Sequence, residues 1–394
     1  MSQPILLLNC GSSSIKYQLL DPEHVSPLAV GIVQRIGMGA STITHEVGGD
    51  EYTETKPFAN HTEAVAAVVQ MFRLNGPSLD DVQAVGHRTV HGGSTFVESV
   101  LITDEVIDEL RKLSTLAPLH NPPAIAGIQA AQEVLPDVPH VGIFDTAFFA
   151  QLPAEAYTYA LDRDVARKYS IRKYGFHGTS HQFVSGRAAR FLDRDIESLK
   201  LIVCHLGNGA SISAIDGGRA IETSMGLTPL QGLVMGTRSG DVDPGLHHYL
   251  NTHGISAGEI DTLLNKKSGM LGLCGYTDMR DVQAQIEQGN EAAQLAADVY
   301  VHRLVSYIGS YIAILGGCDA IVFTAGVGEN ASFIREAVIN RLGYFGIRLD
   351  ADANAVRSKH PRAISTPDST IAALVVPTNE ELAMARETLR VIGA

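Results

Sequence analysis

The sequence contains few cysteines and has no excess of basic residues. Its four cysteines, Cys10, Cys204, Cys274 and Cys318, are far apart and form no CxxC pair, so we predict neither a zinc site nor a disulfide framework. This pattern is typical of a reducing compartment. Acidic residues outnumber basic ones by 43 to 30, giving a net charge of −13. That balance argues against a nucleic-acid-binding protein, which usually carries a basic surface, but it does not exclude a nucleotide ligand.

A long uninterrupted apolar run is also missing. The longest apolar stretch, residues 292–317, contains Asp298, His302 and Arg303, so we expect a long buried helix there and not a membrane span. The N-terminal segment has no basic region ahead of a hydrophobic one. We therefore expect no secretory signal peptide and a cytoplasmic protein without membrane attachment.

Length and composition indicate a folded protein of more than one domain. A chain of 394 residues is too long for one ordinary core, and its 45% hydrophobic and 19% charged residues are typical of globular proteins. Glycine is abundant, with 38 residues, which indicates many tight turns or ligand loops.

A weak internal repeat suggests how the domains are built. Residues 5–21 and residues 201–216 both read as an apolar strand, a glycine-containing polar turn, a second strand and an aspartate, which is typical of duplicated domains. Alternating strand and helix patterns favour two α/β domains. We expect mixed sheets, because each opening strand pair has a turn too short for a parallel crossover. No low-complexity linker marks the boundary, which we place near residue 150.

Local patterns predict further elements along the chain. We expect helices over residues 61–74, 104–113 and 122–134, strands over 82–86, 141–144 and 319–324, and a glycine loop over 325–330 followed by a helix to about residue 342.

Several loops after apolar strands carry residues suited to phosphate. In residues 9–16, serine hydroxyls and turn N–H groups can form an anion nest, with Lys16 adding a positive charge. The alternative is a plain hairpin with a polar turn, and the Walker A pattern is absent. Glycine pairs recur at 207–209 and 326–328. Together these loops match the rule that ligands of α/β folds bind at strand ends.

Two arginines, Arg88 and Arg238, lie in polar loops where a guanidinium can bind phosphate or carboxylate. For Arg238 the alternative is a salt bridge to Asp241. Asp145 follows a buried strand, where an acidic residue is costly unless it faces a site.

Two histidine pairs have the i, i+4 spacing that can bind zinc on a helix: His87 with His91, and His177 with His181. Neither pair carries the HExxH pattern. We therefore interpret these histidines as phosphate ligands or hydrogen-bonding core residues.

Taken together, these segments resemble the acetate and propionate kinase family. The matching stretches span nearly the whole chain: residues 9–16, 87–93, 117–123, 144–148, 173–181, 205–211, 226–244, 323–330 and 378–381. The resemblance implies two duplicated ribonuclease H-like (actin-like ATPase) domains, with mixed sheets flanked by helices and a nucleotide cleft between them. It implies residues 1–150 as the N-terminal domain, completed by a C-terminal helix at 381–394. Residues 151–380 would form the C-terminal domain, with most of the nucleotide site.

The resemblance also implies an activity: reversible, direct in-line transfer of the γ-phosphoryl group of ATP to acetate, with Mg²⁺ (or Mn²⁺ in its place), by a homodimer. Family motifs assign the site residues one by one. The catalytic residues are Arg88, Asp145, His177 and Arg238, with Arg88 also holding the acetate carboxylate. The methyl pocket is Val90, Leu119, Phe176 and Pro229. The ATP site is Lys16, His205, Leu206, Gly207, Asn208, Gly209, Asp278, Met279, Arg280, Gly326, Val327, Gly328, Glu329 and Asn330, and the metal ligands are Asn9 and Glu380.

The sequence departs from the family pattern at Phe149, where histidine is expected, at Gln231, where glutamate is expected, and over residues 273–277. Acetate is already ionised at pH 7, because such acids have a pKa of about 4, so we expect Asp145 to orient the metal or a cationic side chain and not to act as a base. The rival interpretations are a propionate or butyrate kinase and, from another class, a non-catalytic ATP-binding switch or filament protein.

Overall fold

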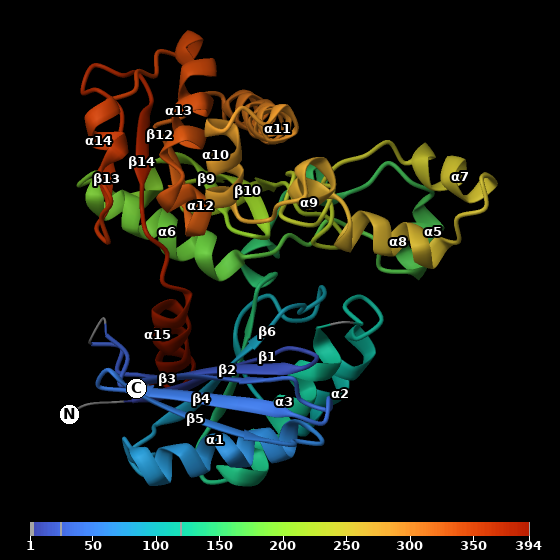
Figure 1. Ribbon diagram of the computed structural model, residues 1–394, viewed down its shortest axis with the longest axis vertical. Helices are drawn as coiled ribbons and strands as arrows, with labels where there is room; N and C mark the ends of the chain where they lie inside the picture. Colours follow the sequence, from blue (N-terminus) through green and yellow to red (C-terminus); the bar gives the residue numbers. More distant parts are fainter. Residues whose placement is uncertain (1–3, 24–25, 119, 394) are drawn as a thin grey trace. The chain divides into compact units, whose positions relative to one another are not determined.

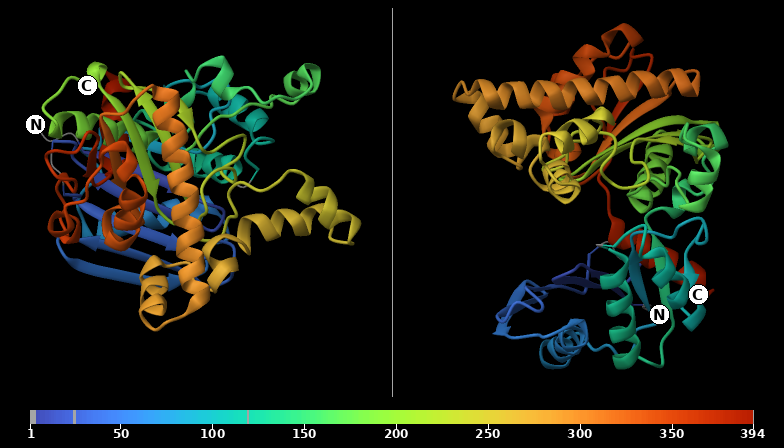
Figure 2. Two further views of the ribbon diagram at one scale, coloured as in Figure 1. Left: turned by 90° about the horizontal axis from the view of Figure 1, so that it is seen from above. Right: turned by 90° about the vertical axis from the view of Figure 1, so that its right-hand side faces the viewer.

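The computed structural model of the chain describes residues 4–23, 26–118 and 120–393. It divides into two compact α/β units (Figure 1; Figure 2). Unit 1 consists of Met1–Ala150 and Asn379–Ala394, and unit 2 of Gln151–Thr378. The C-terminal helix therefore belongs to the same unit as the N-terminal strands.

Unit 1 is built on one mixed sheet. In sheet order its strands are β5 (Asp50–Lys56), β4 (Ser41–Val47), β3 (Ala29–Gln34), β2 (Ser14–Leu20), β1 (Ile5–Cys10), β6 (Ala84–Thr89), β8 (His140–Phe144) and β7 (Val100–Leu101). Strands β1 to β5 pair antiparallel, whereas β1, β6 and β8 are parallel neighbours.

The helices of unit 1 pack on its sheet or on one another through their apolar faces. Helix α1 (His61–Asn75) begins at Asn60, whose side chain accepts a hydrogen bond from the Glu63 N–H, and ends at Gly76. Together with α3 (Asn121–Val134) it covers one core. Helix α2 (Asp104–Leu113) packs on α3, and α15 (Glu380–Ile392) packs on β6, β1 and β8. A short 3₁₀ helix, η1 (Ala147–Phe149), follows β8.

Unit 2 has a second mixed sheet. Its strands, in sheet order, are β11 (Arg219–Thr223), β10 (Ala210–Asp216), β9 (Lys200–Leu206), β12 (Ala320–Thr324), β14 (Ala372–Val375) and β13 (Arg362–Ala363). Strand β9 pairs antiparallel with β10 and parallel with β12. Nearly every residue of β9 and β12 is buried, as expected of strands covered on both faces.

The helices of unit 2 flank this sheet (Figure 1). They are α4 (Ala154–Tyr157), α5 (Arg163–Lys168), α6 (Gly178–Phe191), α7 (Gly245–Thr252), α8 (Ala257–Lys266), α9 (Gly269–Cys274), α10 (Met279–Glu287), α11 (Glu291–Leu315), α12 (Ala325–Asn330), α13 (Ser332–Arg341) and α14 (Ala351–Ala355), with the 3₁₀ helices η2 (Ile196–Ser198) and η3 (Gly343–Phe345). Helix α11 packs on β10 and β9, while α6 packs on β9 and β12.

The two sheets share one strand plan. The order β3-β2-β1-β6-β8 in unit 1 corresponds to β11-β10-β9-β12-β14 in unit 2. In both, three antiparallel strands are followed by two parallel ones. The expected fold class, two duplicated α/β units with mixed sheets flanked by helices, is confirmed.

Most predicted elements exist, and one was wrong. Helices α1, α2 and α3 form where local patterns indicated, and the long α11 forms over the longest apolar stretch. No helix in the described part of the chain is long and apolar enough to cross a membrane. Residues 325–330, expected to be a glycine loop, form the short helix α12, in which the Glu329 carboxylate accepts a hydrogen bond from the Ala325 N–H. This side-chain bond to the first turn compensates for the poor helix propensity of glycine.

Candidate active site

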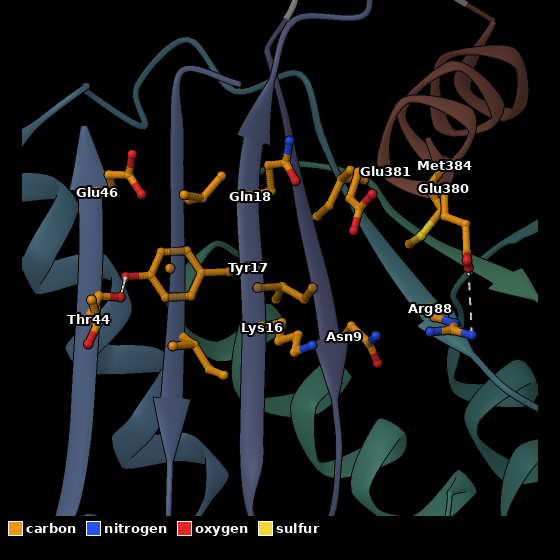
Figure 3. A pocket seen from close by; sticks show the side chains of 15 residues that line it. Asn9, Lys16, Tyr17, Gln18, Thr44, Glu46, Arg88, Glu380, Glu381 and Met384 are labelled. Atoms are coloured by element: carbon orange, nitrogen blue, oxygen red, sulfur yellow. Dashed lines mark hydrogen bonds and ion pairs between the residues drawn. The ribbon is translucent and has the colours of Figure 1, made fainter. Parts of the chain in front are cut away.

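A cavity of about 340 Å³ lies in unit 1, over the face of the sheet that carries α15 (Figure 3). Among its lining residues are four that the sequence assigned to the site: Asn9, Lys16, Arg88 and Glu380. Further lining residues, which the sequence did not indicate, include Gln18, Thr44, Glu46, Glu381 and Met384.

The β1–β2 hairpin brings two of these residues together. Asn9 pairs with Lys16 across the antiparallel ladder, so both side chains lie on the same face (Figure 3). Their neighbours Leu8, Cys10 and Ile15 belong to the core on the opposite face. The plain hairpin interpretation is therefore right in geometry, but the polar residues of that hairpin line a cavity.

Arg88 is held by two carboxylates. Its Nε and Nη2 donate to the two oxygens of Asp145 at 3.0 and 2.8 Å, and its Nη2 lies 3.7 Å from Glu380. The Asp145 side chain is only 3% exposed, and its charge raises the pKa of Arg88. Within the described residues no hydrogen bond involves Arg88 Nη1, so this donor remains available to a ligand.

Glu380 is the first residue of α15, after the cap residue Asn379. Burial raises the pKa of Glu380 to about 7, with Asp145 and Glu381 adding to the effect and Arg88 opposing it. The described residues contain no cluster of three His, Cys, Asp or Glu side chains suited to a metal. Asn9 and Glu380 instead offer two oxygen ligands on one cavity, which is the donor set that Mg²⁺ accepts when phosphates and water complete it.

In unit 2, His177 and Arg238 approach one another at Gly209. A β-carbon on Gly209 would lie 3.5 Å from Arg238 Nη1 and 3.5 Å from His177 Nε2. His177 directly precedes α6 and adopts a left-handed backbone with φ of 61°, a conformation that costs a non-glycine residue energy and is often found at functional sites. The missing side chain at Gly209 leaves room for a ligand atom beside both groups.

Arg238 does not form the salt bridge that the sequence allowed. Asp241 binds the Arg303 guanidinium at 3.1 Å, accepts from Tyr307 at 2.6 Å and accepts from the Gly232 N–H. Arg238 donates only to the Pro229 carbonyl oxygen at 3.1 Å and to the Met235 sulfur at 3.6 Å among the described residues. Burial lowers the pKa of its guanidinium. A partly buried arginine without a carboxylate partner is suited to an anionic ligand.

A second cavity, of about 540 Å³, lies in unit 2 and gathers several separate segments. They include the turn after β9, the start of α10 and helix α12 with the start of α13. Eight of the predicted ATP residues line it: Gly207, Asn208, Asp278, Met279, Arg280, Gly326, Val327 and Asn330. Asp278 caps α10 and accepts from the Arg280 side chain.

Comparison with known proteins decides the family. The sequence matches the acetokinase family over residues 4–386. The chain belongs to this family. It is 53% identical to an acetate kinase of Clavibacter michiganensis over 98% of both chains, and 52% identical to one of Desulfitobacterium hafniense over 98% of this chain and 99% of that one.

Solved structures of the acetokinase family agree in fold. A crystal structure of Porphyromonas gingivalis acetate kinase has a TM-score of 0.95 at 44% identity, covering 99% of this chain and all of that one. A propionate kinase from Francisella tularensis has a TM-score of 0.92 at 39% identity, covering 98% of each chain.

Six residues assigned to ATP do not line the second cavity: Lys16, which lines the first one, and His205, Leu206, Gly209, Gly328 and Glu329. The Glu329 carboxylate instead accepts from the N–H groups of Ala325 and Thr378, and burial raises its pKa. His205 Nδ1 is bonded to Ser180 Oγ at 2.8 Å. In this structure, Glu329 stabilises the first turn of α12, and His205 contributes to a buried polar network.

The proposed methyl pocket is only partly described. Val90 lies in unit 1, whereas Phe176 and Pro229 lie in unit 2, and none of the three lines either cavity. Phe176 is buried, and Pro229 contributes the carbonyl oxygen bound by Arg238. Leu119 lies outside the described residues.

The structure adds residues that sequence reasoning missed and explains two family departures. Arg357 and Phe333 line the second cavity, yet neither lies in a recognisable motif. Gln231 accepts a hydrogen bond from the Tyr159 hydroxyl at 2.5 Å, which an amide oxygen does as well as a carboxylate. Phe149 is fully buried against Phe148, where an apolar ring is more stable than histidine.

Proposed function

We propose that the chain is an acetate kinase, which transfers the γ-phosphoryl group of ATP reversibly to acetate and yields acetyl phosphate and ADP. The observation that carries the proposal is that His177 and Arg238 flank Gly209, and that Arg238 has no carboxylate partner among the described residues. Such an arrangement offers donors and positive charge to a phosphoryl group, whereas a switch or filament protein has no need of it.

Acetate would bind at Arg88. The guanidinium is fixed by Asp145 through Nε and Nη2, and Nη1 is left for the ligand carboxylate. Because acetate is ionised at neutral pH, no base has to activate it. Asp145 would therefore act by holding Arg88 in one orientation.

The transferring phosphoryl group would be stabilised by Arg238 and His177. Phosphoryl transfer relies mainly on positioning and on neutralising charge, and preorganised donors in a partly buried site supply both. We expect direct in-line attack by the acetate oxygen, with no phosphorylated residue.

The nucleotide would occupy the cavity of unit 2. Gly207 and Gly326 line this cavity, a β-carbon on Gly326 would meet no atom within 4 Å, and Asp278 to Arg280 form a polar wall. His205, Leu206, Gly209, Gly328 and Glu329 would support these segments, and Lys16 would reach the phosphates from unit 1.

Mg²⁺, or Mn²⁺ in its place, would be held by Asn9 and Glu380 together with phosphate oxygens. When bound, the ion supplies positive charge to the phosphates. Family resemblance further supports a cytoplasmic homodimer, with residues 1–150 and 381–394 as the acid-binding and metal-binding domain and residues 151–380 as the nucleotide domain. Size-exclusion chromatography with light scattering tests the dimer.

The decisive experiment is a hydroxamate assay for acyl phosphate with ATP, Mg²⁺ and acetate, propionate or butyrate. We expect kcat/KM to fall about tenfold from acetate to propionate, because an extra methylene in a pocket costs about 1–3 kcal/mol. The similarity to the Francisella propionate kinase makes propionate kinase the second candidate, and a preference for propionate would establish it. No acyl phosphate with any acid would favour the non-catalytic alternative.

A further inference from the structure

A chain of hydrogen bonds runs from the interior of unit 2 to His177. His181 Nδ1 lies 2.7 Å from Ser213 Oγ, and His181 Nε2 lies 2.8 Å from Ser211 Oγ. Ser211 Oγ in turn lies 2.9 Å from His177 Nδ1. The spacing in sequence explains the contacts: the serines are two residues apart on β10 and so share a face, and the histidines are four apart at the start of α6.

The middle of this chain is sealed from solvent. Ser211, Ser213 and His181 are each 0% exposed. Burial, reinforced by the neighbouring His205, lowers the pKa of His181 well below its ordinary value. His181 is therefore a neutral imidazole, which carries a proton on only one of its two ring nitrogens.

These facts couple the protons of the two histidines. Among the described residues, Ser211 Oγ has hydrogen-bond contacts only to these two ring nitrogens, so its single proton goes to one of them and the other donates to its oxygen. If His181 Nε2–H donates to Ser211, then Ser211 donates to His177 Nδ1, and His177 keeps its proton on Nε2. In the reverse direction His177 Nδ1–H donates to Ser211, and a neutral His177 presents a bare nitrogen at Nε2.

The surroundings of His177 favour the first direction. Its Nε2 lies beside the space over Gly209, next to the positive Arg238 guanidinium. The His205 ring stacks on it with centroids 4.4 Å apart. A second positive charge on His177 is unfavourable there, whereas phosphoryl oxygens need a donor. A neutral His177 with its proton on Nε2 satisfies both conditions.

We propose that His181 is a positioning residue: through Ser211 it fixes His177 as the neutral Nε2–H tautomer, so that His177 donates to the transferring phosphoryl group. The chain then runs Ser213 O–H to His181 Nδ1, His181 Nε2–H to Ser211, Ser211 O–H to His177 Nδ1, and His177 Nε2–H to the ligand. The choice of direction and the last link rest on the proposed function. The contacts among the four side chains are properties of the protein without substrate.

The tautomer can be read without turnover. ¹⁵N NMR of the protein labelled at histidine distinguishes protonated from bare ring nitrogens, and the variant His177→Gln identifies the His177 signals by their loss. At pH 7 we expect a protonated Nε2 and a bare Nδ1 for His177, and a protonated Nε2 for His181. A wild-type His177 with its proton on Nδ1, or an imidazolium, would overturn the proposal. Because this readout needs no substrate, it separates the proposal from the acetate kinase assignment.

Variants then test the link to catalysis. Ser211→Ala and His181→Leu should change the His177 spectrum and lower kcat about 10- to 100-fold, by analogy with residues that orient metal-binding side chains. His181→Gln keeps an N–H donor near the Nε2 position and should restore most of kcat and the Nε2–H signal.

The matched control is Ser224→Ala. Ser224 is similarly buried and accepts a hydrogen bond from the N–H of Ile212, the residue after Ser211, but it is not a member of this hydrogen-bonded chain. It should lower stability as Ser211→Ala does and leave the His177 spectrum unchanged. If Ser224→Ala and Ser211→Ala shift the spectrum and kcat equally, or if folded His181→Leu leaves both unchanged, His181 has no positioning role.

Discussion

Two arginines, one in each unit, are embedded in opposite electrostatic surroundings. Arg88 is clamped by Asp145 and lies beside Glu380, so its charge is already balanced in the free protein. Arg238 contacts a carbonyl oxygen and a sulfur, and Asp241, the nearby carboxylate, is bound by Arg303 and Tyr307. A balanced arginine suits orientation of a monoanion, whereas an unbalanced one suits a highly charged phosphoryl group.

The comparison predicts the largest kinetic effect at Arg238. Arg238→Ala should lower kcat about 10²–10³-fold, as when one transition-state donor is lost, because no other cation in its loop replaces the charge. The free energy of unfolding should change little, since Arg238 pairs with no carboxylate in the described part of the chain. Steady-state kinetics measures kcat, and denaturant unfolding measures the free energy of unfolding. Arg194→Ala, which removes an exposed arginine of the same unit, is the control and should leave kcat unchanged. A large stability loss with a normal kcat would mean that Arg238 is structural.

Arg88 should behave differently, because it holds a buried carboxylate. Arg88→Ala leaves Asp145, 3% exposed, without its partner, and breaking such a pair typically costs about 3 kcal/mol. We expect that loss in the free energy of unfolding, together with a higher KM for acetate. Arg88→Lys keeps the charge but not the two-pronged contact, so it should recover stability more than KM. Equal stability losses for Arg88→Ala and Arg238→Ala would remove the contrast between the two arginines.

The sequence predicted the elements better than the connections among their side chains. Helix α1 was predictable because Asn60 and Gly76 mark its ends and its apolar period is regular. The run β3 to β5 was not, because the exposed β5 has no alternating apolar pattern. Helix α12 was not either, because its glycines suggest a loop and the stabilising Glu329 contact to Ala325 is made only in the folded chain.

In the candidate site, too, the sequence indicated residues better than it indicated their side-chain partners. Motifs indicated Asn9, Lys16 and Glu380, which line one cavity although Glu380 is more than 360 residues away in sequence. Spacing cannot reveal whether a loop arginine finds a partner: Asp241 is three residues from Arg238, yet it binds Arg303 on α11. Pairings of this kind depend on which helix packs over the loop, and that is a tertiary property.

Lowering the pH should reduce the stability of unit 1 through a buried histidine pair, with no role for Arg88 or Arg238. His87 Nε2 and His140 Nδ1 are 2.9 Å apart, and burial, then His140, lowers the pKa of His87 well below 6.5. Below pH 6.5 the unfolded chain therefore binds a proton at His87 that the folded chain does not bind. The contribution of His87 to the free energy of unfolding is fully present above pH 6.5 and is lost as the pH falls. For His87 the loss from pH 7 to 5 should be at most about 2 kcal/mol, the value reached when the folded imidazole stays neutral over that whole range. Denaturant unfolding at several pH values measures it.

The matched variants for this pair are His87→Gln and the exposed His253→Gln. The first should lower stability at pH 7 but flatten its acid dependence, because the buried titrating group is gone. His253→Gln should leave the pH dependence of the free energy of unfolding unchanged. An unaltered slope in His87→Gln would place the acid sensitivity in the other buried histidines, such as His181 of unit 2.

The smallest effect should come from one methyl group at Gly209. In Gly209→Ala the added carbon would lie 3.5 Å from both Arg238 Nη1 and His177 Nε2, which is ordinary van der Waals contact, so we expect the melting temperature to stay close to wild type. The methyl would nevertheless fill the space in which a phosphoryl oxygen must meet those two groups. We expect kcat to fall about tenfold, since small misplacements of reacting groups are costly. Gly258→Ala on α8, where a β-carbon meets no atom within 4 Å, is the control and should leave kcat unchanged. If Gly209→Ala kept kcat but weakened nucleotide binding, the nucleotide and not the transferred phosphoryl group would occupy the space over Gly209. The contrast between Arg88 and Arg238 would then concern which substrate each arginine binds.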